Sequence, residues 1–202
     1  MPCLGITGGI ATGKSSFVKA VSPLFPAEVF DADRCSRELL THDPQVQLEV
    51  RQYFGGHVFT AEGSVDRVKL RELVFSDCSG RKALEAILHP RIRERWTSLA
   101  LTAKASTDWL IVDIPLLFET RVEDYFNSII VVACSARNQI ERLIQTRKLD
   151  TEIASQMMAS QLELRVKMQQ AGHVIWNDGS ISCMEQQAVL AADYFKKVPW
   201  MK

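Results

Sequence analysis

Residues 8–16 carry the side chains and the backbone freedom that binding a phosphate group requires. Gly8 and Gly13 bracket four residues and are followed directly by Lys14 and Ser15, which is the full spacing of a phosphate-binding loop. Glycines let the backbone turn several N–H groups toward one point, Lys14 can reach the β- and γ-phosphates of a nucleotide, and the Ser15 hydroxyl can bind Mg²⁺. A glycine turn that merely carries a lysine is the alternative. The nucleotide contacts predicted in this loop are Gly9, Ala11, Thr12, Gly13, Lys14, Ser15 and Ser16.

Acidic residues stand at the ends of two apolar runs. Asp31 and Asp33 are two residues apart at the end of the run 27–32, so in extended backbone their side chains face one way. A carboxylate there can accept the proton of an attacking hydroxyl group, whereas capping of the following helix is the rival interpretation for one of the pair. Asp113 ends a second apolar run, where an acid can hold Mg²⁺ directly or through water and where a plain turn residue is the alternative.

Five short apolar runs are predicted to form the strands that position these residues. Most are nearly continuous rather than alternating, which is typical of a parallel sheet covered on both faces. Helical stretches lie between them, and the segments 14–24 and 136–147 are examples. The sequence therefore predicts an α/β fold of the P-loop NTPase type, in which a five-stranded parallel sheet carries helices on both faces. The predicted strands are residues 3–7, 27–32, 109–114, 128–133 and 173–177.

Two long helical stretches interrupt this alternation of strands and helices. A small P-loop fold with two helical insertions suits a kinase of a small molecule, because one insertion can hold the acceptor and the other can close over the phosphates and exclude water. We predict a nucleotide-binding core of residues 1–33, 108–136 and 172–202, a helical acceptor-substrate domain of residues 34–107 and a helical lid of residues 137–171.

The composition is that of an ordinary globular protein and argues against several classes of partner. The 202 residues carry 24 basic and 24 acidic side chains, so no net charge draws the chain to nucleic acid or to an anionic membrane. No apolar run is long enough to span a bilayer, and no signal peptide is expected. The five cysteines contain no C-x-x-C pair, which indicates reduced thiols in a cytoplasm. We predict a cytoplasmic monomer or weak homo-oligomer that binds neither nucleic acid nor a membrane.

Several segments of the sequence, in their order along the chain, resemble those of the dephospho-CoA kinases. They are LGITGGIATGKSS, VFDAD, FGGHVF, VDRVKL, LEAILHPRI, VDIPLLFE, QIERLIQTR and HVIWNDGS, and they run over nearly the whole chain. The phosphate loop is shared by many families, whereas DAD, HPxI and DxPLLFE together are specific to this one. The resemblance implies transfer of the γ-phosphoryl group of ATP to the ribose 3′-hydroxyl of dephospho-CoA, the last step of coenzyme A synthesis, with ATP and Mg²⁺ as cofactors.

The resemblance also assigns roles to single residues. Asp33 is the catalytic base, with Lys14 and Arg147 as the other catalytic residues. Further assignments are the acceptor contacts His89, Arg91, Leu116 and Glu119 and the nucleotide contacts Arg142, Arg147 and Asn177. Each has a plainer interpretation, because lone histidines are usually structural, PLLFE alone indicates core packing, most arginines are solvated and asparagine is common in turns. Arg142 and Arg147 are five residues apart, so either the helix ends near Arg147 or only one of them reaches the nucleotide.

The match is least typical in the predicted lid. Family members usually have an arginine where Met157 stands and an aspartate where Lys148 stands, and in the phosphate loop they usually have glycine in place of Ala11. Two other functions compete with the resemblance: a P-loop kinase of another nucleoside or small metabolite, and a nucleotide-binding regulator that has lost catalysis. The retained lysine, serine and aspartates argue against the regulator, and the PLLFE and HPxI segments argue against another acceptor.

Overall fold

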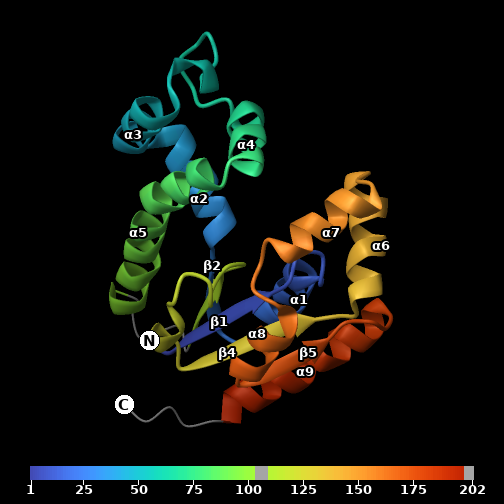
Figure 1. Ribbon diagram of the computed structural model, residues 1–202. Helices are drawn as coiled ribbons and strands as arrows, with labels where there is room; N and C mark the ends of the chain where they lie inside the picture. The colour runs from blue at the N-terminus through green and yellow to red at the C-terminus, as the bar shows by residue number, and fades with distance from the viewer. Residues whose placement is uncertain (103–108, 198–202) are drawn as a thin grey trace. The chain divides into compact units, whose positions relative to one another are not determined.

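The computed structural model describes residues 1–102 and 109–197, which divide into two compact units (Figure 1). One unit combines Met1–Phe30 with Ala100–Lys202, and the other is Asp31–Leu99. The first unit therefore contains the phosphate loop, and the second contains both Asp31 and Asp33. The boundary predicted between residues 107 and 108 lies outside the described residues.

A five-stranded sheet lies at the centre of the first unit. Its strand order is β2-β3-β1-β4-β5, and the pairings described for β1 with β3, β1 with β4 and β4 with β5 are all parallel. The predicted sheet is confirmed, and each strand begins at the predicted residue and ends within one residue of the predicted end. The strands are β1 (Cys3–Gly8), β2 (Ala27–Asp31), β3 (Trp109–Asp113), β4 (Ser128–Ala133) and β5 (His173–Trp176).

Helices and a loop cover the two faces of this sheet. On one face, Ile6 of β1 and Ile130 of β4 are buried with Phe17 in a cluster formed with α1 (Lys14–Val21) and α9 (Ile181–Lys197), and α9 lies along β5 in Figure 1. Gly5 faces the other side, because side chains alternate along a strand. A Cβ on Gly5 would lie 2.8 Å from Leu117, so the loop after β3 lies directly on β1. The helix α8 (Leu164–Gln170) packs on β4.

The segment between β4 and β5 is helical throughout most of its length. The helices α6 (Ala136–Arg147) and α7 (Thr151–Ala159) pack against each other, as Figure 1 shows. Ser135 caps α6 by accepting from the Asn138 N–H, and Asp150 caps α7 in the same way. The helix α6 ends at Arg147 because Lys148 adopts a left-handed backbone with φ of 56°. Short 3₁₀ turns complete this unit at η1 (Ser22–Leu24) and η3 (Glu123–Tyr125).

The second unit is built mainly from helices. Aspartates begin four of them: Asp31 caps α2, Asp43 caps α3, Asp66 caps α4 and Asp77 caps α5, each by accepting from backbone N–H groups of the first turn. Every helix buries apolar side chains, among them the large Trp96, which is only 2% exposed. The elements are α2 (Ala32–His42), α3 (Pro44–Phe54), η2 (Gly56–Val58), α4 (Arg67–Ser76) and α5 (Cys78–Thr102), the last of which continues into the first unit.

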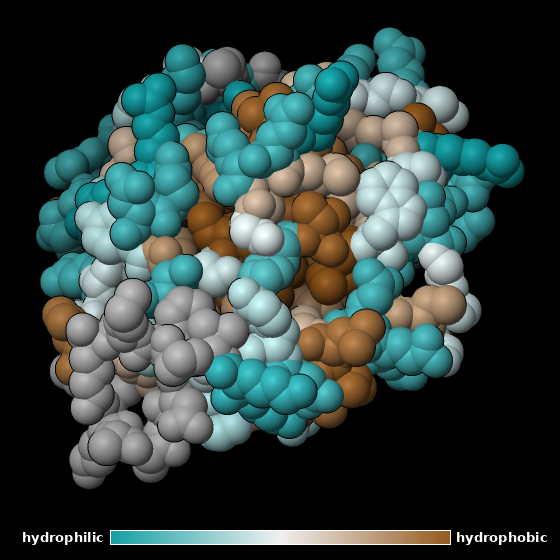
Figure 2. Space-filling model, turned by 90° about the horizontal axis from the view of Figure 1, so that it is seen from below, coloured by the Kyte–Doolittle hydropathy of each residue, from teal (hydrophilic) through white to brown (hydrophobic). Residues whose placement is uncertain are grey.

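The surface mixes polar and apolar side chains. Figure 2 shows one face on which apolar atoms gather near the centre with polar atoms around them. Val174 and Trp176 of β5 are among the exposed apolar residues, at 39% and 46%. Over the ranges that the structure describes, none of the helices has the length and the apolar character needed to cross a membrane.

Candidate active site

The phosphate loop runs from Gly8 at the end of β1 to Lys14 at the start of α1. Its backbone is left-handed at Gly13, with φ of 93°, and at Ala11, with φ of 59°. A Cβ at Gly13 would lie 2.2 Å from Asn177 Nδ2, so this position requires glycine. At Ala11 the left-handed backbone costs roughly 1–2 kcal/mol, a cost that glycine avoids. The N–H groups at the start of a helix are donors for an anion, and in the first turn of α1 that of Ser16 donates to the Gly13 carbonyl at 3.0 Å.

Thr12 closes the loop upon itself. Its hydroxyl group donates to the carbonyl oxygen of Gly9 at 2.9 Å, and its backbone N–H donates weakly to the same oxygen at 3.4 Å. The residue is completely buried, and its side chain shapes the loop. Ser15 and Ser16, in contrast, are exposed in the first turn of α1.

Lys14 and Asp113 form an ion pair beside the loop. The register of β1 and β3 pairs Asp113 with Ile6, so the carboxylate lies at the end of a strand next to the one that leads into the loop. The carboxyl ends of parallel strands are where α/β sheets bind ligands. The two side chains are 12% and 8% exposed, and this shielding from water strengthens their attraction. The structure thus brings together two residues that the sequence assigned to phosphate and to Mg²⁺.

Arg142 and Asn177 also lie against the loop, but they bind its carbonyl oxygens. The Arg142 guanidinium donates to the carbonyls of Ala11 and Thr12, each at 3.3 Å, and to that of Asn177 at 2.7 Å. The Asn177 amide donates to the Thr12 carbonyl at 2.8 Å, and the residue is only 8% exposed. Both residues therefore hold the backbone of the loop in this structure. Arg147 lies elsewhere: it is exposed as the last residue of α6.

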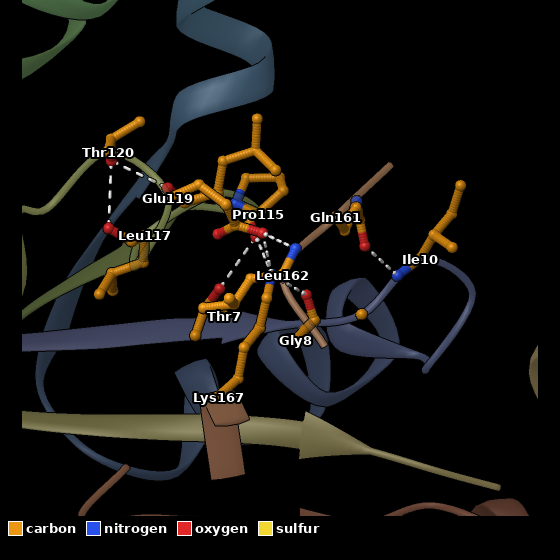
Figure 3. A network of polar contacts seen from close by, with 12 residues as sticks. Thr7, Gly8, Ile10, Pro115, Leu117, Glu119, Thr120, Gln161, Leu162 and Lys167 are labelled. Atoms are coloured by element: carbon orange, nitrogen blue, oxygen red, sulfur yellow. Dashed lines mark hydrogen bonds and ion pairs between the residues drawn. The ribbon is translucent and has the colours of Figure 1, made fainter. Parts of the chain in front are cut away.

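The loop after β3 contributes a polar network that reaches the Gly8 end of the phosphate loop (Figure 3). The Glu119 carboxylate accepts from Lys167 Nζ at 2.7 Å and from the backbone N–H of Leu162 at 3.0 Å. Its side chain is 22% exposed, whereas that of Lys167 is completely buried. Glu119, predicted as an acceptor contact, thus has two intramolecular partners, and Leu116 in the same loop is half-buried.

Asp31 and Asp33 occupy different backbone conformations. Asp31 ends β2 and caps α2 by accepting from the Arg34 N–H at 2.9 Å, which is the role foreseen for one of the pair. Asp33 is exposed in the first turn of α2. The expectation that both lie in extended backbone with their side chains facing one way is therefore wrong for Asp33, because the helix begins at Ala32.

His89 and Arg91 both lie on α5 in the second unit. Burial lowers the pKa of His89, despite an opposing effect of Glu85, so the imidazole is neutral at neutral pH and offers a hydrogen bond rather than a charge. Arg91 donates to Glu49 at 2.7 Å and to the Ile87 carbonyl at 2.6 Å. The hydrogen bond from Arg91 holds the pKa of Glu49 below its usual range.

Sequence reasoning missed Lys167, Gln139 and Gln161. Gln139 donates to the Ile10 carbonyl at 2.7 Å, and Gln161 accepts from the Ile10 N–H at 2.8 Å. A signal existed for Gln139, because it lies one turn before the buried Leu143 on the inner face of α6. The other two offered none, since a lysine or glutamine in a polar helical stretch is normally exposed.

Comparisons with known proteins agree on one family. The family model described as dephospho-CoA kinase matches residues 2–182. A Carboxydothermus hydrogenoformans protein named dephospho-CoA kinase is 32% identical over 203 residues, an alignment that covers 100% of this chain and 98% of the relative. The solved structure of dephospho-CoA kinase from Campylobacter jejuni has a TM-score of 0.69 at 27% identity and covers 96% of this chain and 97% of its own. A solved Thermus thermophilus structure has a TM-score of 0.79 at 27% identity, covering 98% of both chains.

Proposed function

This chain belongs to the dephospho-CoA kinase family, and we propose that it transfers the γ-phosphoryl group of ATP to the ribose 3′-hydroxyl of dephospho-CoA. The observation that carries the proposal is the Lys14–Asp113 ion pair beside a complete phosphate loop, in a chain that the family model matches over residues 2–182. Backbone donors, an ammonium and a carboxylate at this place are the parts by which P-loop enzymes hold nucleotide phosphates and their metal.

Binding of ATP engages the loop and Lys14 together. The N–H groups of the loop and of the first turn of α1 donate to the β- and γ-phosphates. The Lys14 ammonium, which Asp113 holds in this structure, turns its donors to the phosphate oxygens and stabilises the charge that develops between the leaving and the transferred groups. The ion pair with Asp113 keeps Lys14 close to this position beforehand.

The donor set near Lys14 fits Mg²⁺. The Asp113 carboxylate and the Ser15 hydroxyl supply the hard oxygen ligands that this ion prefers, and Mg²⁺ is commonly held by one or two protein oxygens together with water and substrate phosphates. When bound, the ion supplies charge neutralisation at the β- and γ-phosphates. We propose that Ser15 and Asp113 hold it there.

Asp33 is proposed as the base that accepts the proton of the 3′-hydroxyl as the new oxygen–phosphorus bond forms. The assignment is supported by the capping role of Asp31, which commits that carboxylate to the Arg34 N–H, while Asp33 is exposed. Residues 34–107 are proposed to hold dephospho-CoA. Its acceptor contacts are proposed to be His89 and Arg91, with Leu116 and Glu119 from the loop after β3.

Residues 137–171 are proposed as the lid that closes over ATP and excludes water from the reaction. Arg147, at the exposed end of α6, is its proposed catalytic cation. Arginines in other phosphoryl-transfer enzymes contribute about 10³–10⁵ in kcat. We predict that Arg147→Ala lowers kcat at least about tenfold, a small part of that contribution. Its unfolding midpoint stays unchanged, because an exposed side chain changes stability by no more than about 0.5 kcal/mol.

Arg142→Ala is expected to behave differently. This change removes the hydrogen bonds to the carbonyls of Ala11, Thr12 and Asn177, and hydrogen bonds to charged groups are worth about 1.5–3 kcal/mol. We predict a lower unfolding midpoint and weaker ATP binding. The matched control on the same helix is Arg137→Ala, whose side chain is 85% exposed. Steady-state kinetics with thermal unfolding of the three variants separate the roles, and a wild-type kcat in Arg147→Ala would show that this residue is only a solvated helix charge.

The thiols support a reducing location. Cys3, Cys35, Cys134 and Cys183 are free, and burial raises the pKa of Cys134 to about 11, which keeps it a neutral thiol. We propose a cytoplasmic enzyme that acts as a monomer or weak homo-oligomer and requires neither nucleic acid nor a membrane.

One assay tests the proposed function. The purified chain is incubated with ATP, Mg²⁺ and dephospho-CoA, the product is detected by its mass, and ³¹P NMR locates the new phosphate on the ribose. We expect the product to be coenzyme A with the new phosphate at the 3′ position. With adenosine as the acceptor, we expect a far lower kcat/KM than with dephospho-CoA. A higher kcat/KM with adenosine would indicate a kinase of another acceptor. Binding of ATP without transfer to either compound would indicate a regulator.

A further inference from the structure

Side chains from outside the phosphate loop hold two of its backbone carbonyl groups. Lys167 Nζ on α8 donates to the Gly8 carbonyl at 3.3 Å, which Figure 3 shows. Gln139 Nε2 on α6 donates to the Ile10 carbonyl at 2.7 Å, and Gln139 is only 5% exposed. Neither carbonyl belongs to a helix, so these side chains are their main hydrogen-bond donors. Loss of the donors would leave two largely buried carbonyl groups poorly paired, which costs free energy.

The carbonyls of Gly9, Ala11 and Thr12 also accept from side chains, and for Gly9 the donor belongs to the loop itself. Arg142 binds those of Ala11 and Thr12, and Asn177 binds that of Thr12 a second time. The Gly9 carbonyl accepts from the Thr12 hydroxyl at 2.9 Å. From residue 8 to residue 12, every carbonyl of the loop therefore has a side-chain donor.

Because a peptide group is planar and trans, a hydrogen bond that fixes the direction of its carbonyl also fixes the direction of its N–H group. In each peptide group the C=O of one residue and the N–H of the next point in opposite directions. Lys167, by holding the Gly8 carbonyl, sets the direction of the Gly9 N–H, and Gln139, by holding the Ile10 carbonyl, sets that of the Ala11 N–H. These N–H groups point away from the side chains that hold their peptides, and so toward the other side of the loop.

The burial of Lys167 supports a geometric role rather than a contribution to stability alone. Its ammonium is 0% exposed and donates to the Gly8 and Pro115 carbonyls, each at 3.3 Å, and to Glu119 at 2.7 Å. These three acceptors match the three donors of an ammonium group. A buried ion pair is costly to desolvate, and a well-packed apolar residue is often as stabilising. The ammonium fixes the directions of the Gly8 and Pro115 carbonyls, which an apolar side chain cannot do.

We propose that Lys167 and Gln139 are positioning residues that pre-organise the phosphate loop by holding the carbonyl groups of Gly8 and Ile10, so that the N–H groups of Gly9 and Ala11 are aimed at the phosphates before ATP arrives. Donors that are already aimed need no reorganisation when charge develops during the reaction. The proposal rests on the proposed binding of ATP phosphates by this loop. It extends that function to two residues that act through the backbone of the loop.

The first test uses Gln139→Met, which keeps the length of the side chain and removes the donor. ATP and adenosine binding are measured by isothermal titration calorimetry at a temperature where circular dichroism shows a folded protein. ATP affinity is expected to fall about tenfold, the size of one lost hydrogen bond, while adenosine affinity stays unchanged because adenosine has no phosphates. Gln139→Lys, which restores a donor, recovers much of the ATP affinity. The matched control is Gln145→Met, at an exposed glutamine of the same helix.

The second test uses Lys167→Met with Lys167→Arg as the conservative variant. Lys167→Met is expected to lose ATP affinity at least about tenfold and to keep adenosine affinity, and Lys167→Arg, which retains a cationic donor, recovers part of the loss. Arg165→Met, at an exposed position of α8, is the control and binds both ligands like the wild type. If Lys167→Met does not fold, the Gln139 variants decide the question.

Two results would overturn the proposal. One is wild-type ATP affinity in folded Gln139→Met, and the other is an equal loss of ATP and adenosine affinity, which indicates general loosening of the unit. Neither measurement includes dephospho-CoA or follows phosphoryl transfer. A wild-type chain that binds ATP but transfers nothing to dephospho-CoA would therefore refute the proposed function and leave this test standing.

Discussion

A Lys14→Ala variant is expected to lose most phosphoryl transfer, with kcat reduced by at least about 10²–10³-fold, the cost of removing one pre-organised donor from a transition state. The ammonium is a compact charge at the start of α1, and the backbone N–H groups of the loop cannot replace it as charge develops on the phosphates. Single-turnover transfer from labelled ATP to dephospho-CoA measures the loss directly, without interference from product release.

The ion pair with Asp113 makes stability a necessary control for this variant. Removal of one partner of a buried pair costs about 3–5 kcal/mol, and the two side chains here are 12% and 8% exposed. The assay is therefore run at a temperature below the unfolding transition. A double variant, Lys14→Ala with Asp113→Asn, is measured beside the single variant, because Asp113→Asn removes the carboxylate that would otherwise lack its partner. Lys19→Ala, at an exposed lysine of the same helix, is the matched control. Near wild-type turnover in folded Lys14→Ala would contradict the assignment of the phosphate loop.

The fold could be predicted from the sequence because its signals are local. The strands were predicted from nearly continuous apolar runs, which are typical of a covered parallel sheet. The inner strands β1, β3 and β4 are buried almost throughout, whereas the edge strands β2 and β5 are partly exposed. The phosphate loop was predicted from glycine spacing, and Gly13 indeed has φ of 93° in a place where any side chain would meet Asn177. The helix α6 ends at Arg147, as one of the two alternatives held, because Lys148 has a left-handed backbone; which of the two arginines reaches the nucleotide stays a prediction.

The partners of the site residues could not be predicted, because they depend on segments far apart in the sequence. Arg142 and Asn177 were expected to meet the nucleotide, yet in this structure both bind carbonyl groups of the phosphate loop. Lys167 is separated from Gly8 by 159 positions, and nothing in its sequence neighbourhood marks it as buried. Residues that support a loop through its backbone carry no motif of their own, since a side chain of any donor type at the right place can do so.

Asp33→Asn is expected to lower kcat by about 10²–10⁴-fold, the usual contribution of a general base. Asparagine has nearly the same size and cannot take up the proton of the 3′-hydroxyl. Asp33 is exposed in the first turn of α2 while Asp31 caps the helix, so the change leaves the cap intact. The loss of a carboxylate near the helix N-terminus costs only about 0.3–1 kcal/mol. Binding of ATP, measured by calorimetry, should therefore be unchanged, and the loss should appear in kcat alone.

Asp31→Asn is the comparison that makes this prediction decisive. Asparagine is as good an N-cap as aspartate, so Asp31→Asn keeps its bond to the Arg34 N–H and differs from the wild type only in charge. We expect its kcat to stay within a few-fold of the wild-type value. If Asp31→Asn abolished turnover while Asp33→Asn retained it, the base would be Asp31, and its cap bond would have to break during the reaction. Equal, small effects of both changes would exclude either aspartate as the base and would move the search to other carboxylates.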